Sequence, residues 1–315
     1  MRNVLPLVVT FVVTAAIASV ARADGVVYIE DGGLQGIATP SGFRYVVVEE
    51  RDHSILERIG PSGRIVAVRV FPGRFTIAAV ARDRATSGLS ADRKTLVLVN
   101  TRYGLPRAST RFLILSLPGL FVRSAPTLMG DFSFDAISPD GSLLYFIQHT
   151  SRRDTTRYAV RAFDRASGTL LPGAIVDRTE PDEIMRGNPL SRVTSPDGRW
   201  AYTLYDGGGK TPFVHALDTV GRRARCIDLD ALAGRQDLLS LRLRRGSVGA
   251  IFVVAQGKRI LSIETRAFHV TGPSAASSAS KTGLPWAPIG GAIAALVAGS
   301  LVSIFLVRRR RLATT

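Results

Sequence analysis

Short apolar runs alternate with small polar turn residues along most of the chain, and these runs recur at near-equal spacing. Aligned on the turn, they read TPSGFRYVVV from Thr39, SADRKTLVLV from Ser90, SPDGSLLYFI from Ser138 and SPDGRWAYTL from Ser195. The starts are 51, 48 and 57 residues apart, and a fifth run, GSVGAIFVVAQG, begins a further 51 residues on at Gly246. Such a period indicates a repeated supersecondary unit. Turn residues between β-branched and aromatic runs are typical of hairpins.

A second turn recurs within the units, at FDRASGTLLPG, LDTVGRRARC, ERIGPSGRIVAV and, more loosely, LSLPGLFVRS. Two hairpins give each unit four strands, which we expect in the fourth unit at Ser191–Ser195, Trp200–Tyr205, Phe213–Leu217 and Ala224–Leu229. Four-stranded sheets repeated without intervening helices predict an all-β fold, the β-propeller. Residues 24–271 supply about five blades, or six if one unit hides a shortened blade. GVVYIE, residues 25–30, is the strand expected to close the ring against the last unit.

The same motifs carry a resemblance to known repeats. The SPDG turns resemble those of TolB-type and WD-like propellers of exported bacterial proteins, and FDRASGTLLPG resembles the corner of YVTN or surface-layer blades. The likeness spans about residues 25–271, although the Gly-His and Trp-Asp pairs of true WD repeats are absent from the sequence. The resemblance implies a propeller fold and a binding role, and it implies no reaction.

The two ends of the chain predict export and a membrane anchor. Residues 1–23 have a basic start, an apolar stretch and an Ala-Arg-Ala cleavage site, which together are typical of a signal peptide; an uncleaved anchor is the alternative. Residues 289–307 form an uncharged apolar segment of 19 residues, which as a helix spans about 28 Å and therefore a bilayer core. We expect a flexible stalk of small and polar residues at 272–288 and a basic tail at 308–315.

Flanking residues fix the predicted orientation of this anchor. Trp286 is expected at the membrane interface, and a cytoplasmic cluster follows the span at Arg308, Arg309, Arg310 and Arg311. The propeller would then be displayed on the extracellular or periplasmic face of a cell membrane by one span. Small residues recur every fourth position through the segment, a pattern that favours a weak homodimer through this helix.

The chain is strongly basic and holds one cysteine. Lys and Arg number 41 against 25 Asp and Glu, a formal net charge of +16, and a basic surface attracts polyanions such as phospholipid headgroups or teichoic-type polymers. No aromatic residues are interleaved with the arginine clusters, which disfavours nucleic acid as a partner. Cys226 alternates with charged neighbours at strand spacing, which predicts a buried small hydrophobic residue and excludes an internal disulfide.

The sequence offers no catalytic, cofactor or metal site that we would predict. Asp140 and Asp197 head repeated turns, where Asp binds its own backbone, so their expected role is structural. DGGGK, residues 206–210, lacks the spacing of a phosphate-binding loop and is expected to be a hairpin loop. The four histidines fall in four different units without metal-ligand spacing.

An insertion between the third and fourth units, VDRTEPDEIMRGNPL at residues 176–190, is the candidate binding loop on one rim of the ring. Its candidate contact residues are Asp177, Glu180, Asp182, Glu183 and Arg186. The alternative is an ordinary solvated loop.

These features predict a membrane-anchored extracellular propeller that binds a protein partner or an envelope polymer. The alternative is a propeller-type hydrolase or lactonase whose acids or histidines meet at the central channel; an arginine-lined or apolar channel would weigh against it. A sensor is a third hypothesis, and it would need another membrane protein, because only Leu312–Thr315 follow the arginines.

Overall fold

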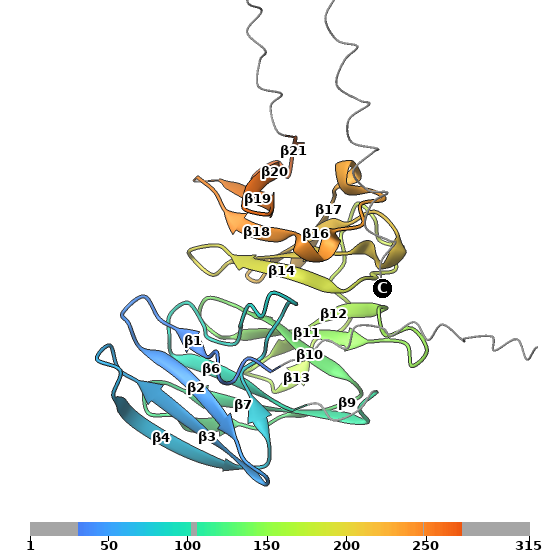
Figure 1. Ribbon diagram of the computed structural model, residues 1–315. Coiled ribbons are helices and arrows are strands. Elements are labelled where there is room, and N and C mark those ends of the chain that lie inside the picture. Colours follow the sequence, from blue (N-terminus) through green and yellow to red (C-terminus); the bar gives the residue numbers. More distant parts are fainter. Residues whose placement is uncertain (1–30, 102–105, 248, 273–315) are drawn as a thin grey trace, which may run out of the picture. The chain divides into compact units, whose positions relative to one another are not determined.

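The computed structural model describes residues 31–101, 106–247 and 249–272, which fold as five antiparallel sheets in chain order (Figure 1). Sheets 1, 3, 4 and 5 have four strands each, paired in sequence order, and sheet 2 has the same order with one additional strand. No α-helix occurs among the described residues, where only three short 3-10 turns interrupt the strands. Successive four-stranded antiparallel sheets of this kind are the blades of a β-propeller.

Each sheet is a simple up-and-down arrangement of neighbouring strands. Sheet 1 contains β1 (Ile37–Ala38), β2 (Arg44–Glu49), β3 (His53–Ile59) and β4 (Ile65–Pro72). Sheet 2 contains β5 (Phe75–Thr76), β6 (Thr95–Asn100), β7 (Ser109–Ser116) and β8 (Phe121–Ser124), with β9 (Thr127–Met129) also paired to β7. Sheet 3 contains β10 (Phe132–Ile137), β11 (Leu143–His149), β12 (Tyr158–Asp164) and β13 (Thr169–Leu170). Sheet 4 contains β14 (Pro189–Thr194), β15 (Trp200–Tyr205), β16 (Phe213–Asp218) and β17 (Arg223–Asp228). Sheet 5 contains β18 (Arg242–Arg245), β19 (Ala250–Ala255), β20 (Lys258–Glu264) and β21 (Val270–Thr271).

The repeated turn joins the first two strands of a sheet and is built by side chain to backbone bonds. In sheet 3, Ser138 Oγ donates to Asp140 Oδ1 (2.7 Å) and accepts from the N–H of Leu143 (2.9 Å), while Asp140 Oδ1 accepts from the N–H of Ser142 (3.0 Å). Gly141 has φ +71°, a conformation that glycine adopts without a steric penalty. The hydrogen bond from Ser138, followed by that from Ser142, lowers the pKa of Asp140. The predicted structural role of this aspartate is confirmed.

The other copies repeat this geometry, and one of them shows what the motif requires. Ser195 and Asp197 make the same bonds in sheet 4. In sheet 2, Ser90 and Asp92 do so too, although Arg93 stands at the glycine position with φ +60°. In sheets 2, 3 and 4 the serine and the aspartate are therefore the constant parts of the turn, because they satisfy backbone N–H groups that the short loop leaves without strand partners. In sheet 1, Thr39 takes the place of the serine and accepts from the N–H of Phe43 (3.1 Å).

Four hydrophobic clusters join the sheets in chain order. They link sheet 1 to 2, 2 to 3, 3 to 4 and 4 to 5. Phe146 is fully buried in the second of these, between the rings of Phe112 (centroids 4.3 Å apart) and Phe163 (6.0 Å). Burying one such ring stabilises the fold by about 1.5–3 kcal/mol. The sheets are thus held face to face by interdigitated side chains, as propeller blades are.

The strand predicted to close the ring and the predicted membrane segments lie outside the residues that the structure describes. None of the described hydrophobic clusters joins sheet 1 to sheet 5, and residues 25–30, the predicted closing strand, lie outside the described residues. The predicted signal peptide, stalk, span and arginine tail also lie outside them, apart from Gly272. Within the described ranges no helix has the length and apolarity needed to cross a membrane.

Candidate functional site

Residues on β10 and β14, the first strands of sheets 3 and 4, make polar contacts between sheets. Arg192 on β14 forms a buried ion pair with Asp135 on β10, and its Nη1 also donates to the Asp135 carbonyl oxygen (3.1 Å). Its Nε donates to Thr203 Oγ1 (2.6 Å). The side chains of Arg192 and Asp135 are only 4% and 3% exposed, so each charge depends on the other to offset the cost of leaving water.

A second tie extends across three sheets. Asp83, in the connection between β5 and β6, accepts a hydrogen bond from Ser191 Oγ on β14 (2.6 Å). Ser191 Oγ in turn accepts from the N–H of Leu243 on β18 (2.8 Å). The N–H of Asp83 donates to the Leu190 carbonyl (3.1 Å). The carboxylates of Asp83 and Asp135 therefore act as structural links between sheets, not as exposed general bases.

His215 on β16 is buried and distant from solvent. Its side chain lies against the ring of Tyr205 (centroids 6.5 Å apart), and Nε2 has no hydrogen-bond partner among the described residues. Burial lowers the pKa of His215 to about 4, with Asp135 opposing that shift and Arg192 reinforcing it. The imidazole is consequently neutral at physiological pH.

Two adjoining pockets lie where the repeated turns approach one another. The first has a volume of about 360 Å³ and is bordered by segments of sheets 1, 2, 3 and 4, including Arg93, Arg192 and Ser195. The second, of about 610 Å³, lies between sheets 4 and 5 and includes Arg245. Both share the segment Thr194, Ser195 and Pro196.

The lining of these pockets is cationic and hydroxyl-rich. The described lining residues include three arginines and several serines and threonines, and none of them is Asp, Glu, His or Cys. Arg93 and Arg245 are exposed, whereas Arg192 is held by Asp135. Guanidinium and hydroxyl groups around a cavity favour an anionic ligand, because they donate hydrogen bonds to phosphate or carboxylate oxygens.

The predicted rim loop lies between β13 and β14, and its residues do not act as one group. Asp177 is buried: although burial favours its neutral acid form, hydrogen bonds from the N–H groups of Thr179 and Cys226 lower the pKa of its carboxyl. Arg225 also contacts Asp177 (3.4 Å). Asp177 thus anchors the loop to β17.

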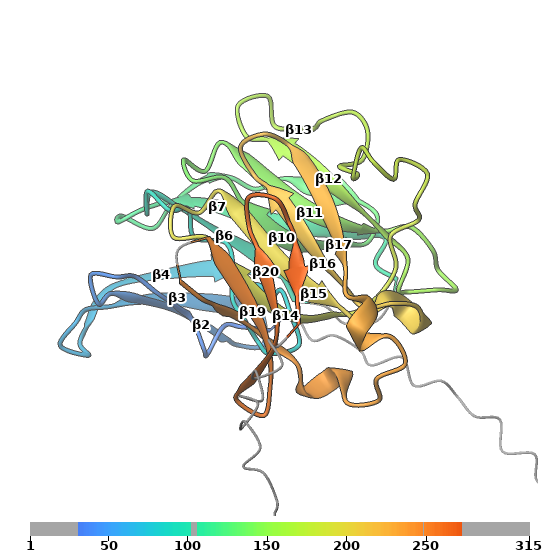
Figure 2. The same ribbon diagram turned by 90° about the horizontal axis from the view of Figure 1, so that it is seen from above.

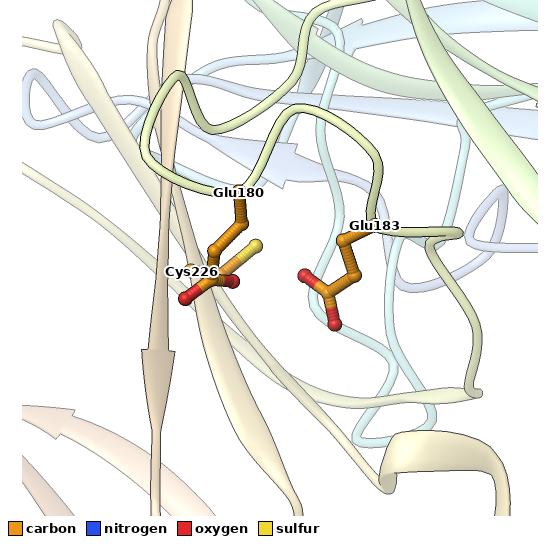
Figure 3. A group of neighbouring side chains, drawn as sticks. All are labelled: Glu180, Glu183 and Cys226. Carbon is orange, nitrogen blue, oxygen red and sulfur yellow. The ribbon is translucent and has the colours of Figure 1, made fainter.

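The other candidate residues of the loop separate into two places. Asp182 is exposed, and Arg186 faces Asp154 in a neighbouring loop (3.4 Å). Glu180 and Glu183, in contrast, come together with Cys226 of β17, and their ligand atoms lie within 4.8 Å of one another (Figure 3). The sequence analysis did not predict this group, because Cys226 lies 43 and 46 residues away along the chain.

The group of Glu180, Glu183 and Cys226 is the described arrangement most able to hold a cation. Burial, followed by the neighbouring Glu183, raises the pKa of Glu180, and burial raises the pKa of the Cys226 thiol. Ligands around a tetrahedral zinc ion at about 2.0–2.3 Å lie roughly 3.5 Å apart, and the ligand atoms of these three side chains lie within 4.8 Å of one another. Because the thiol is protonated, only the two carboxylates carry negative charge toward a cation, as exposed acidic side chains on any protein surface do.

The predicted anchor residues Trp286 and Arg308 to Arg311 lie outside the described residues.

Known proteins provide a comparison for this chain. No protein-family profile matches the chain, and no curated protein matches it.

Several solved structures resemble the chain at low identity. A putative TolB from Agrobacterium tumefaciens is 13% identical, with 78% of this chain and 80% of that chain covered and a TM-score of 0.38. TolB from Acinetobacter baumannii is 12% identical, with 72% and 56% covered and a TM-score of 0.31. A prolyl endopeptidase is 13% identical, with 73% of this chain but only 34% of that chain covered and a TM-score of 0.42. At such values the fold assignment rests on the strand topology described above.

Proposed function

We propose that this protein is a membrane-anchored binding module whose propeller, displayed outside the cell, holds an anionic envelope component. The observation that carries the proposal is the pair of pockets that share Thr194–Pro196 and are lined by arginine and hydroxyl side chains. The charge supports it: without the six arginines of the predicted signal peptide and tail, 35 of the 41 Lys and Arg remain against 25 Asp and Glu. A basic protein attracts polyanions over distances of about a Debye length, roughly 8–10 Å. The apolar span and arginine tail of the sequence support the anchoring.

The acidic loop supplies the second surface of this module, for a protein partner. Glu180, Asp182 and Glu183 are exposed carboxylates in a basic protein. Burial, followed by the neighbouring Glu183, raises the pKa of Glu180, so a Lys or Arg side chain placed between the two carboxylates would stabilise their charged forms. Asp177 and Arg186 serve this surface by fixing the two ends of the loop.

A hydrolase or lactonase is the alternative function. Asp83 and Asp135, the acids described between the sheets, are occupied in structural bonds, and the lining of the pockets is arginine-rich. That lining favours binding over acid–base catalysis. Turnover of ester or lactone substrates by the purified chain, lost on substitution of a pocket residue, would favour the hydrolase instead.

The binding proposal is tested by calorimetric titration of the full chain with a poly(glycerol phosphate) and with neutral dextran. We expect binding to the phosphate polymer alone, and weaker binding at high salt. Each lost arginine contact costs about 1.5 kcal/mol, or roughly tenfold in affinity, so Arg93→Gln combined with Arg245→Gln should lower affinity strongly. Arg51→Gln, an exposed arginine in the turn between β2 and β3, is the matched control. Equal affinity in all three proteins would refute the assignment of the pockets.

Anchoring is tested by fractionation of cells that express the chain. The full chain should remain with membranes after a salt wash, and a chain ending at Gly272 should be released. A full chain that is soluble after the salt wash would contradict the anchor.

A further inference from the structure

Sheet 5 packs one face against sheet 4 (Figures 1 and 2), and the register of its strands shows which side chains the other face carries. The face toward sheet 4 consists of aliphatic side chains of the cluster that joins the two sheets: Leu243, Ile251, Val253, Leu261 and Ile263. Residues directly opposite each other in an antiparallel pair share a face. The opposite face therefore carries three cross-strand pairs: Arg242 with Val254, Arg244 with Phe252, and Val254 with Arg259. We term these five residues the basic face.

The basic face is not covered by another described segment. None of the described hydrophobic clusters includes Phe252 or Val254. Arg244 and Arg259 are exposed, and neither forms an ion pair with an acid among the described residues. The guanidinium carbon of Arg259 lies 4.8 Å from the centroid of the Phe252 ring. The face thus presents two exposed cations beside a partly buried aromatic ring.

The charge of this sheet is one-sided. Residues 242–266 contain six basic residues and one acid, whereas residues 37–72 of sheet 1 contain five basic residues and four acids. The one acid, Glu264, accepts hydrogen bonds from the N–H groups of Arg266 (2.8 Å) and Ala267 (2.5 Å), so it is engaged in its own turn. Such a surface is complementary to anionic phospholipid headgroups, where each Lys or Arg near the bilayer strengthens binding by about fivefold.

The basic face also lies on the sheet that is nearest in sequence to the predicted membrane segment. β21 ends at Thr271, and the 16 residues 273–288 separate Gly272 from the apolar segment that begins at residue 289. A linker of small and polar residues of this length has an average span of roughly 20–24 Å. With residues 289–307 in a bilayer, sheet 5 is held at high effective concentration beside the headgroups, so weak contacts are enough. This tether favours the lipid surface over a free polymer as the occupant.

We propose that the basic face of sheet 5 docks on anionic phospholipid headgroups of the membrane that anchors the chain, with Arg244 and Arg259 as its main contacts. The proposal rests on the membrane anchoring proposed above. It uses a different surface from the anion pockets, whose arginines are Arg93, Arg192 and Arg245.

Quenching by headgroup-labelled lipid measures this contact in the full chain. Gln256→Cys, in the exposed turn between β19 and β20, carries a fluorophore in a Cys226→Ala background. The chain is reconstituted in vesicles that contain a lipid with a nitroxide on its headgroup, and that are made either of phosphatidylcholine or of a mixture rich in phosphatidylglycerol. We expect strong quenching in the phosphatidylglycerol vesicles at low salt, and weak quenching at high salt or in phosphatidylcholine.

A pair of substitutions separates the charge of the face from its packing. Arg244→Gln with Arg259→Gln should lower the ratio of docked to undocked chain by about 25-fold, at about fivefold for each arginine. Arg244→Lys with Arg259→Lys keeps both charges and should dock like the parent. Far-ultraviolet circular dichroism of both variants should match the parent, because both side chains are exposed. The proposal is overturned if phosphatidylglycerol leaves the quenching unchanged, or if the glutamine pair is quenched as strongly as the lysine pair.

Flotation of the same vesicles distinguishes this proposal from the anchoring. If a salt wash releases the chain from phosphatidylcholine vesicles, the anchor is wrong, but docking still requires that the chain float with phosphatidylglycerol vesicles at low salt and that the glutamine pair not do so. A chain that floats with neither kind of vesicle overturns both proposals. If the glutamine pair weakens binding of poly(glycerol phosphate) but not contact with phosphatidylglycerol vesicles, the face binds a polymer and the lipid proposal is wrong.

Discussion

Replacing His215 with leucine should remove most of the acid sensitivity of this fold between pH 6.5 and 4. The side chain is 1% exposed, and burial lowers its pKa from 6.5 to about 4. Above pH 6.5 the imidazole is neutral in the folded and the unfolded chain. As pH falls below 6.5, this imidazole becomes protonated in the unfolded chain, but in the folded chain it stays neutral until about pH 4. The free energy of unfolding therefore falls between pH 6.5 and 4.

The size of the effect follows from the pKa difference. Each pKa unit corresponds to 1.36 kcal/mol, so a pKa about 2.5 units below normal gives about 3 kcal/mol of lost stability by pH 4. The charged groups facing His215 are Asp135, which opposes the shift, Arg192, which reinforces it, and Asp177, which opposes it weakly. These three residues remain in the variant. Leucine fills a similar space, and Nε2 leaves no hydrogen-bond partner behind.

Urea unfolding at pH 7, 6, 5 and 4, followed by tryptophan fluorescence, measures the difference. The parent should lose about 3 kcal/mol more than His215→Leu between pH 6.5 and 4. His53→Leu, which removes an exposed histidine beside Asp52, should follow the parent. If the parent and His215→Leu lose equal stability across this range, the histidine is not buried neutral and the packing of sheets 3 and 4 described above is wrong.

Three further expectations follow from the contacts between and within the sheets. Arg192→Ala leaves the Asp135 charge buried without its partner and should lower the free energy of unfolding by about 3–5 kcal/mol. Arg192→Met combined with Asp135→Leu should restore most of this stability, as measured by urea titration. Gly141→Ala should lower the melting temperature by more than Gly168→Ala. Both glycines have positive φ, but a Cβ at Gly141 would lie 2.6 Å from the hydroxyl oxygen of Thr95, whereas a Cβ at Gly168 would meet nothing within 4 Å. Equal shifts in thermal melts would contradict the contact between the two sheets. Cys226 should react with iodoacetamide at pH 8 many times more slowly in the folded chain than after denaturation in urea, because burial raises the pKa of its thiol, and a fast folded-state reaction would show that the thiol is ionised.

The hairpins of the fold could be predicted because their causes are local. The four strands expected in the fourth unit occur as β14 to β17 with ends within one or two residues of the prediction. The serine and aspartate of the repeated turns in sheets 2, 3 and 4 bind backbone groups within five residues, so the motif specifies the turn wherever it stands. A period of about 50 residues then predicts equivalent sheets, because each copy repeats the same local choices.

The candidate site was only partly predictable, because its residues meet through sheet packing. The insertion at residues 176–190 is a connection between sheets, as expected, but the sequence did not show that Asp177 would be buried or that Glu180 and Glu183 would lie beside Cys226. The contact between Asp83 and Ser191 joins residues 108 positions apart. No periodicity within either segment encodes such a contact.

The sequence alone determined the strands, their turns and the order of the sheets, since alternation of apolar residues and turn chemistry act over about ten residues. The tertiary structure decided which polar groups are satisfied and which surfaces remain open. A valine-rich run such as β4 would suit a buried strand equally well, and only its place at the edge of sheet 1 leaves it exposed. Exposure is a property of what packs against a strand, and that depends on how the sheets meet.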